Sequence, residues 1–226
     1  MKHLEKEMLA LRNEVLDMWT LVCSQLEKTK VALLENDKDL AREVISREKR
    51  VNAYELKIDS DCENYIALYS PVAIDLRLVL SLLKINGTLE RIGDFSEGIS
   101  RFVVDTYDEK YKSLVKEMKL EEMFDELLGM FNGARQSLEA EETKMAGCLF
   151  AKDDYVDSLF RQAIQKIAEY MQTHPEDALT CISLAILARK LERIGDHCNN
   201  IVEEIVFYVD AKVLKHGGKH ANGKEE

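Results

Sequence analysis

Pairs of side chains spaced four residues apart, most of them carboxylates, are the part of this chain that could do chemistry. This spacing puts both side chains on one face of a helix, where two like charges cost about 0.2–0.5 kcal/mol unless something compensates. A bound cation would compensate, so these pairs are candidate metal ligands. In one pair an asparagine replaces an acid, and its amide oxygen can also coordinate. The eight candidates are Glu48, Asn52, Glu90, Asp94, Asp153, Asp157, Glu192 and Asp196.

Two of these pairs lie inside a repeated hexapeptide. Leu-Glu-Arg-Ile-Gly-Asp occurs at residues 89–94 and again at 191–196, an offset of 192 − 90 = 102 residues. Repetition at this distance indicates that a whole supersecondary unit has been duplicated. The motif glycines, Gly93 and Gly195, each cost about 1 kcal/mol in a helix interior, and we expect close helix packing to be the reason for them.

The first four candidates lie at one height of a predicted helical hairpin with its turn at Ser70. Glu48 and Asn52 precede this turn by nearly the same length of chain as Glu90 and Asp94 follow it. Because a helix rises about 1.5 Å per residue, equal lengths of chain on the two sides of the turn mean equal heights. The four side chains would therefore meet at one level of an antiparallel helix pair.

The second four candidates repeat this coincidence around a turn at His174. Asp153 and Asp157 precede it by nearly the same length of chain as Glu192 and Asp196 follow it. Each set thus offers up to four oxygen donors, which suit magnesium, calcium, manganese or iron, and the lack of histidine disfavours zinc or copper. The two sites should differ, because further acids extend only the first. Those acids are Glu55, Asp59 and Glu97, whereas Phe160 and Asn199 occupy the positions that match Glu55 and Glu97.

The elements that must position these residues are helices. The chain of 226 residues holds only two prolines and ten glycines, and its apolar residues recur three and four apart, as in packed helices. In the first half this pattern predicts a helix from Leu4 to near Asn36 and a second one ending before Ser70. Ser70 and Pro71 then provide an N-cap and a first-turn proline for a third helix.

The second half repeats the cycle after a polar break at residues 105–110. We predict a helix to about Gly147, one from Asp153 to Gln172, and one opened by Pro175 that runs towards Leu214. The fold class is therefore all-α, with two tandem, sequence-related three-helix bundles and six long helices. The expected boundaries are 1–108 for the first repeat, 109–214 for the second, and 215–226 for a disordered tail.

Charge and composition exclude several classes of protein. The formal net charge of −11 is unsuited to binding nucleic acid. Five cysteines without any CxxC spacing indicate reduced thiols rather than a disulfide framework or a zinc site. No apolar stretch approaches the roughly 18 residues of a membrane span, and no signal peptide is visible. We expect a cytoplasmic protein.

The repeated hexapeptide, together with Asp-His-Cys-Asn-Asn-Ile at 196–201 and Pro-Val-Ala-Ile-Asp-Leu-Arg at 71–77, resembles the PhoU family. The resemblance implies two three-helix bundles whose Glu/Asp-x-x-x-Asp motifs hold metal in some members, at the eight positions given above. It also implies a negative regulator of phosphate uptake and signalling, acting between the phosphate ABC transporter ATPase and a phosphate-sensing histidine kinase. Contact with the membrane would come only through those partners, and a homo-oligomer, with a dimer favoured, is expected.

Two other classes of function stay open. A carboxylate-bridged metalloenzyme would use the Glu-x-x-His spacing of ferritin-like di-iron sites, but no histidine here has a glutamate three residues before it. A purely structural helical scaffold would leave its acidic stripes facing water. We therefore expect no enzyme activity and no catalytic residues, with metal ions as the only cofactors.

Overall fold

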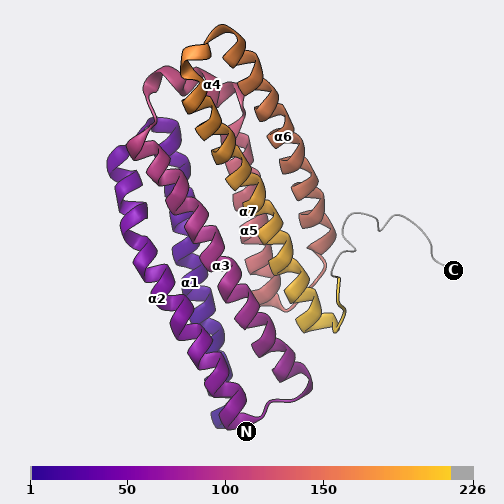
Figure 1. The fold of residues 1–226 in the computed structure, drawn as a ribbon. Coiled ribbons are helices and arrows are strands. Elements are labelled where there is room, and N and C mark those ends of the chain that lie inside the picture. Colours follow the sequence, from indigo (N-terminus) through magenta and orange to yellow (C-terminus); the bar gives the residue numbers. More distant parts are fainter. Residues whose placement is uncertain (1, 215–226) are drawn as a thin grey trace, which may run out of the picture.

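The computed structural model describes residues 2–214, and the regular secondary structure in that part of the chain is helical (Figure 1). The predicted disorder of residues 215–226 lies outside the described residues. The long helices form two groups of three, as the sequence predicts. The helices are α1 (Lys2–Glu35), α2 (Lys38–Tyr69), α3 (Ala73–Asp105), α4 (Lys112–Glu117), α5 (Leu120–Ala140), α6 (Ala146–Thr173) and α7 (Ala178–Asp210), with 3₁₀ turns η1 (Glu109–Tyr111) and η2 (Pro175–Asp177).

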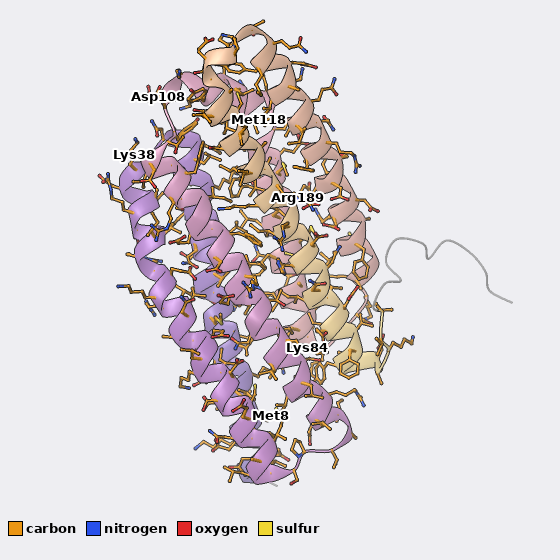
Figure 2. The ribbon with its side chains drawn as sticks, in the orientation of Figure 1. Met8, Lys38, Lys84, Asp108, Met118 and Arg189 are labelled. Carbon is orange, nitrogen blue, oxygen red and sulfur yellow. The ribbon has the colours of Figure 1, made fainter. Side chains whose placement is uncertain are left out.

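The first bundle consists of α1, α2 and α3, which pack against one another along their lengths. The apolar stripe of α1 is its inner face, because Val15, Met18 and Val22 are completely buried. Asp37 starts α2 as an N-cap, and its carboxylate accepts hydrogen bonds from the backbone N–H groups of residues 39 and 40. Figure 2 shows Met8 of α1 and Lys38 of α2 near opposite ends of this bundle.

The second bundle consists of α5, α6 and α7, with the short α4 packed against α5 and α6. A buried aspartate connects several residues at the end of this bundle where α6 turns into α7. Asp177 in η2 accepts hydrogen bonds from Lys110 Nζ at 2.7 Å, from Tyr111 Oη at 2.9 Å and from Tyr170 Oη at 2.9 Å. The connection between the repeats is therefore anchored to the turn between α6 and α7.

The two bundles share a continuous core through the pairs α3–α7 and α1–α5. Between α1 and α5, Trp19 packs on Phe131 with ring centroids 5.1 Å apart, and Trp19 is completely buried. Arg12 of α1 donates to the carbonyl of Leu138 at 2.7 Å, which satisfies the end of α5. The tandem repeats thus form one packed body.

Several predicted helix boundaries are wrong, including the start of α6, which is Ala146 rather than Asp153. Ser70 ends α2 in a left-handed conformation (φ 47°), and Val72, without a side-chain cap, precedes α3. In the second half, α5 ends at Ala140 and α6 begins at Ala146, so the helix predicted to reach Gly147 is broken at residues 141–145. Glu141 adopts φ 55° there and its N–H bonds the carbonyls of the last turn, which ends the helix without a glycine.

The last helix ends at Asp210, earlier than the predicted end near Leu214. All five cysteines are free thiols, and Cys62, Cys181 and Cys198 are buried. Within residues 2–214, no helix is both long enough and apolar enough to cross a membrane.

Candidate metal centres

The first acidic cluster forms where α2 faces the repeated motif of α3. We define it as Glu48, Glu90, Asp94 and Glu97. Glu48 is only 8% exposed, and a Cβ added to Gly93 would lie 3.4 Å from its Oε2 atom. Gly93 therefore leaves room for a buried carboxylate on the neighbouring helix, which extends the predicted packing role of this glycine.

A glutamine from α1 holds the Glu48 carboxylate by one oxygen. Gln25 is completely buried, and its Nε2 donates to Glu48 Oε2 at 3.2 Å. The other oxygen, Glu48 Oε1, is buried and has no hydrogen-bond partner. Burial, together with the nearby carboxylates of Asp94, Glu97 and Glu90, raises the pKa of Glu48 to about 7, and the Gln25 hydrogen bond opposes this rise.

The second acidic cluster has the same construction at the second motif copy. We define it as Asp153, Asp157, Glu192 and Asp196. Asp153 on α6 is 6% exposed and lies against Gly195 so closely that a Cβ there would overlap its Oδ1 atom. Burial, Asp157 and Asp196 raise the pKa of Asp153 to about 7. In both clusters a glycine of the motif faces a buried acid of the preceding helix.

The anchoring amide of the second cluster comes from a different helix. Asn199 of α7 donates from Nδ2 to Asp153 Oδ2 at 2.6 Å. As at Glu48, the second oxygen, Asp153 Oδ1, is buried without a hydrogen-bond partner. Asn199 stands at the position that matches Glu97, so the second cluster has an amide where the first has an acid.

The structure brings the eight predicted residues only partly together. Glu48 lies within electrostatic reach of Glu90 and Asp94, and Asp153 within reach of Asp157 and Asp196. Asn52 is exposed, and so are Asp94 and Asp196. In the described part of the chain, no three His, Cys, Asp or Glu side chains converge closely enough to hold a metal ion.

Cationic side chains stand at the rim of each cluster. Arg91 lies 3.6 Å from Glu90, Arg101 donates to Glu97 at 2.5 Å, and Arg189 donates to Glu192 at 2.7 Å. These pairs are partly exposed and contribute little to stability. Each arginine already occupies an oxygen of Glu90, Glu97 or Glu192, so these acids would have to exchange or share that partner before all four members of a cluster reached one ion.

The donor chemistry of both clusters fits a hard cation. A buried carboxylate oxygen without any partner is costly, and Glu48 Oε1 and Asp153 Oδ1 are both such atoms. A cation bound to either oxygen would supply the missing partner and return the carboxyl group to its charged form. Sequence reasoning missed Gln25 and Asn199 as anchors. For Gln25 a signal exists, because it continues the buried α1 stripe of Val15, Met18 and Val22 with a polar side chain.

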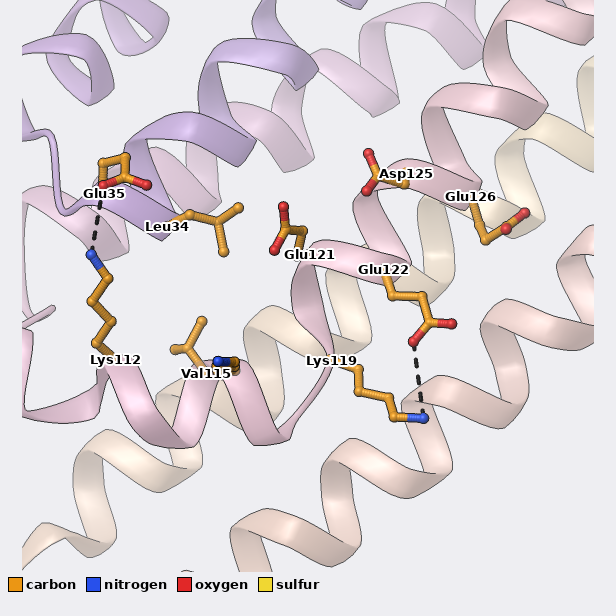
Figure 3. Close-up of a pocket in the computed structure, with 10 residues that line it drawn as sticks. Leu34, Glu35, Lys112, Val115, Lys119, Glu121, Glu122, Asp125 and Glu126 are labelled. Atoms are coloured by element: carbon orange, nitrogen blue, oxygen red, sulfur yellow. Dashed lines mark ion pairs between the residues drawn. The ribbon is translucent and has the colours of Figure 1, made fainter.

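A large surface groove lies away from these clusters. It has a volume of about 610 Å³ and runs between the end of α1, α4 and the start of α5 (Figure 3). Lys112 and Lys116 of α4 and Lys119 line it together with acids of α5. Several of the lining charges are paired, such as Lys112 with Glu35 of α1 at 3.5 Å and Lys119 with Glu122 at 3.9 Å. None of its lining residues is a buried polar side chain that lacks a partner, so we assign the groove no role.

Two packed three-helix bundles, each with a buried acid set against a motif glycine, define a duplicated helical-bundle protein with two acidic centres. The PhoU domain matches residues 15–103 and 120–205, one match in each bundle. This chain belongs to the PhoU family.

Individual relatives agree over nearly the whole chain. The "Phosphate-specific transport system accessory protein PhoU" of Escherichia coli (strain K12) is 31% identical over 94% of this chain and 87% of its own length. The protein of that name from Edwardsiella tarda is 31% identical over 92% of this chain and 85% of its own.

Solved structures agree as well. PhoU from Pseudomonas aeruginosa superposes with a TM-score of 0.84 at 26% identity, covering 92% of this chain and 99% of that one. The phosphate transport system regulatory protein PhoU from Streptococcus pneumoniae shares the fold, with a TM-score of 0.85 at 24% identity over 93% and 98% of the two chains.

Proposed function

We propose that this chain is an accessory protein of phosphate-specific transport that represses the phosphate-starvation response when phosphate is plentiful. It would act in the cytoplasm, without enzyme activity, by contacting the phosphate ABC transporter ATPase and a phosphate-sensing histidine kinase. The observation that carries the proposal is the match of both repeats to relatives named as accessory proteins of that transport system. The acidic surface also favours protein partners over nucleic acid.

Gene deletion tests this role. Removing the gene should raise phosphate-starvation transcripts in phosphate-rich medium, and the intact gene should restore repression. Affinity capture from phosphate-replete cells should recover the transporter ATPase and the kinase. The proposal fails if transcripts stay low after deletion and neither partner is recovered. Turnover of a substrate by purified, metal-loaded protein would favour the carboxylate-bridged enzyme instead.

We further propose that the two acidic clusters bind cations. Support comes from one buried oxygen each of Glu48 and Asp153 that has no hydrogen-bond partner. In both repeats the buried acid also packs against the glycine of the repeated motif. The acids that pair with arginine would exchange that partner for the cation on binding, because oxygen-seeking cations need several carboxylate ligands. The eight predicted residues supply the donors, with Asn52 as the weakest member because it is an uncharged amide among seven acids.

Metal analysis of untagged protein, purified without chelator, tests this second proposal. Replacing Asp153, Asp157, Glu192 and Asp196 by alanine should remove the metal of the second cluster and leave helical content intact. A matched control replaces four exposed acids outside the clusters, namely Glu5, Asp39, Glu63 and Glu117. If the cluster variant keeps its metal, or if native protein stays metal-free after supplementation, the clusters are not metal sites.

A further inference from the structure

The two arginines of the repeated motif come together where the bundles join. Arg91 and Arg193 are equivalent residues, because 193 − 91 = 102 is the offset of the repeat. They lie on α3 and α7, which pack side by side and run in opposite directions (Figure 1). Two ring side chains that are also equivalent, Phe95 and His197, contact each other across this helix pair, with ring centroids 5.6 Å apart. The two motif copies therefore meet at one level of the molecule.

Both arginines lie beside this ring pair. Each is four residues before the ring of its own helix, so the two side chains share a helix face. The Arg193 guanidinium lies over the ring of Phe95 on the other bundle, 5.2 Å from the centroid. Burial and the charge of Arg193 lower the pKa of His197, Asp196 opposes this shift, and Arg91 adds to it. Two guanidinium groups, one from each bundle, thus lie near a single imidazole.

The N–H donors of both guanidinium groups lack acceptors. Among the described residues, Arg193 has its ring contact and no hydrogen bond or ion pair. Arg91 has an ion pair with Glu90, whose 3.6 Å separation is too long for a hydrogen bond. His197 Nδ1 is buried and also has no hydrogen-bond partner. A guanidinium is a planar fork of five donors, and this shape matches an oxyanion such as phosphate.

We propose that Arg91, Arg193 and His197 form a binding site for inorganic phosphate between the two bundles. An anion held between the two guanidinium groups would accept hydrogen bonds from both and offset the repulsion between them. One of its oxygens would give His197 Nδ1 the partner that it lacks. Each repeat supplies one arginine, so the site exists only in the packed body. The proposal rests on these side chains and does not require the regulatory role proposed above.

Acids beside the arginines select which anion fits. Glu90 lies 3.6 Å from Arg91, and Glu55 is within electrostatic reach of the same arginine. Asp196 is within electrostatic reach of His197. These carboxylates repel a bare anion but accept a hydrogen bond from a protonated one. Inorganic phosphate keeps a proton at pH 7, whereas sulfate and most phosphomonoester molecules carry none. The acids therefore favour inorganic phosphate over both.

Binding should be weak and sensitive to salt. The Arg91 side chain is 64% exposed, and dissolved ions screen exposed charges. The neighbouring acids also oppose the approach of any anion. We therefore expect phosphate to bind at low ionic strength and to be released as salt increases.

Equilibrium dialysis of the full chain with radiolabelled phosphate, at low ionic strength, tests the proposal. Native protein should bind phosphate saturably. Replacing both Arg91 and Arg193 by alanine should weaken binding at least about tenfold, because hydrogen bonds to charged groups are lost. The matched control replaces Arg50 and Arg161, exposed arginines of α2 and α6, and makes the same change in net charge. This control should bind phosphate like native protein, and helical content should be unchanged in both variants.

Two single changes separate charge from hydrogen-bond geometry. Arg193→Lys keeps the charge but loses the fork, so its affinity for phosphate should lie between those of native protein and Arg193→Ala. His197→Phe keeps a ring beside Phe95 and removes the Nδ1 donor, so it should also weaken phosphate binding. Equal affinity of native protein and both single variants would mean a diffuse attraction of positive charge, and would overturn the site.

Competing ligands and chemical modification identify the ligand and locate the site. Sulfate and glycerol 3-phosphate should displace bound phosphate only at higher concentrations. Phosphate should slow the modification of Arg193 by phenylglyoxal and leave that of Arg161 unchanged, as measured by peptide mass spectrometry. Prior removal of metal with a chelator should not abolish binding, because the arginines hold the anion rather than a cation in the acidic clusters.

The proposal is overturned if native protein binds no phosphate, if the variant without Arg91 and Arg193 binds it like native protein, or if chelation abolishes binding. Equal displacement by sulfate or glycerol 3-phosphate would overturn the assignment of inorganic phosphate as the ligand. Gene deletion is independent of these binding measurements, so their failure would not affect the regulatory role.

Discussion

At the scale of residues, the motif glycines determine how each buried acid fits. Gly195→Ala would drive a methyl group into Asp153 Oδ1, whereas Gly93→Ala meets Val51 Cγ1 at 3.2 Å. The two copies of one motif therefore differ in how much space they leave. At Gly195 the nearest atom is an oxygen of the buried Asp153 carboxylate, whereas at Gly93 it is a methyl group of Val51.

Three alanine variants test this difference. Gly87→Ala, where nothing lies within 4 Å of the new methyl group, should stabilise the protein by up to about 1 kcal/mol through helix propensity. Gly195→Ala should lie about 1–3 kcal/mol below Gly87→Ala because of overpacking, and Gly93→Ala should fall between them. Urea unfolding measures all three, and equal stabilities would contradict the account.

The raised pKa of Glu48 predicts a pH-dependent stability of metal-free protein. The folded-state pKa of about 7 exceeds the ordinary value of 4.5. The destabilisation is therefore absent below pH 4.5, grows between pH 4.5 and 7, and is complete above pH 7. Glu48→Gln should stabilise the chelated protein by roughly 1–3 kcal/mol at pH 8 and hardly at all at pH 4.

The control for this titration is a carboxylate with the opposite shift. Hydrogen bonding to Lys28, with the nearby charges of Arg47 and Lys28, lowers the pKa of Glu43. Glu43→Gln should therefore give no gain at pH 8. Denaturant midpoints of both variants at pH 4, 6 and 8, in the presence of chelator, decide the matter. A gain for Glu48→Gln that is the same at all three values would rule out titration as its cause.

Sequence spacing predicted the acids of the two clusters but not what holds them. Helical periodicity places Glu48 level with Glu90, and this was sufficient to find the first cluster. It could not identify Asn199 as the anchor of Asp153, because the hydrogen bond between them depends on how closely two helices pack. It also could not show that Arg101 and Arg189 pair with Glu97 and Glu192, since rotamers depend on local pairing.

At the scale of elements, the six long helices follow from the apolar pattern, whereas the short α4 and the helix ends do not. The prediction for Ser70 failed because the preference of serine for N-caps does not reveal whether the residue ends one helix or begins the next. The break after Ala140 was missed because Glu141 enters the left-handed region, where glycine is the usual signal. Backbone hydrogen bonding to the last carbonyls decides both ends.

The end of α2 gives a test at this scale. Ser70 has φ 47°, which glycine adopts without the steric cost that other residues pay. Ser70→Gly should therefore stabilise the protein by up to about 1 kcal/mol. Ser60→Gly, in the exposed interior of the same helix, should destabilise it by about 0.5–1 kcal/mol. Thermal unfolding of both variants should show shifts of opposite sign, and shifts of the same sign would contradict the assignment of Ser70 as a helix end.

At the scale of the whole molecule, the repeats should unfold together. The single tryptophan, Trp19, is packed between the bundles on Phe131. Its fluorescence therefore reports on their junction, whereas circular dichroism reports on all the helices. We expect the two denaturant transitions to coincide, as they do in two-state unfolding. Separate midpoints would mean that the bundles come apart before they unfold.

Packing rather than metal should maintain this structure. The buried core runs through every long helix of the described chain, unlike small metal domains, which lack such a core and unfold without their ion. Chelated protein should therefore keep its helical circular dichroism signal. Loss of that signal on chelation would show that metal is required for folding.

Lys190 of the second bundle crosses directly over Gly98 of the first, and its ammonium group fills the space where a side chain at residue 98 would begin. Neither position belongs to the repeated motif. Inheritance should nevertheless link them, because a side chain gained at 98 would displace the Lys190 ammonium group and favour a shorter residue at 190. Among PhoU relatives the residues at these two positions should covary. An alignment of the family would then report a contact between its two bundles.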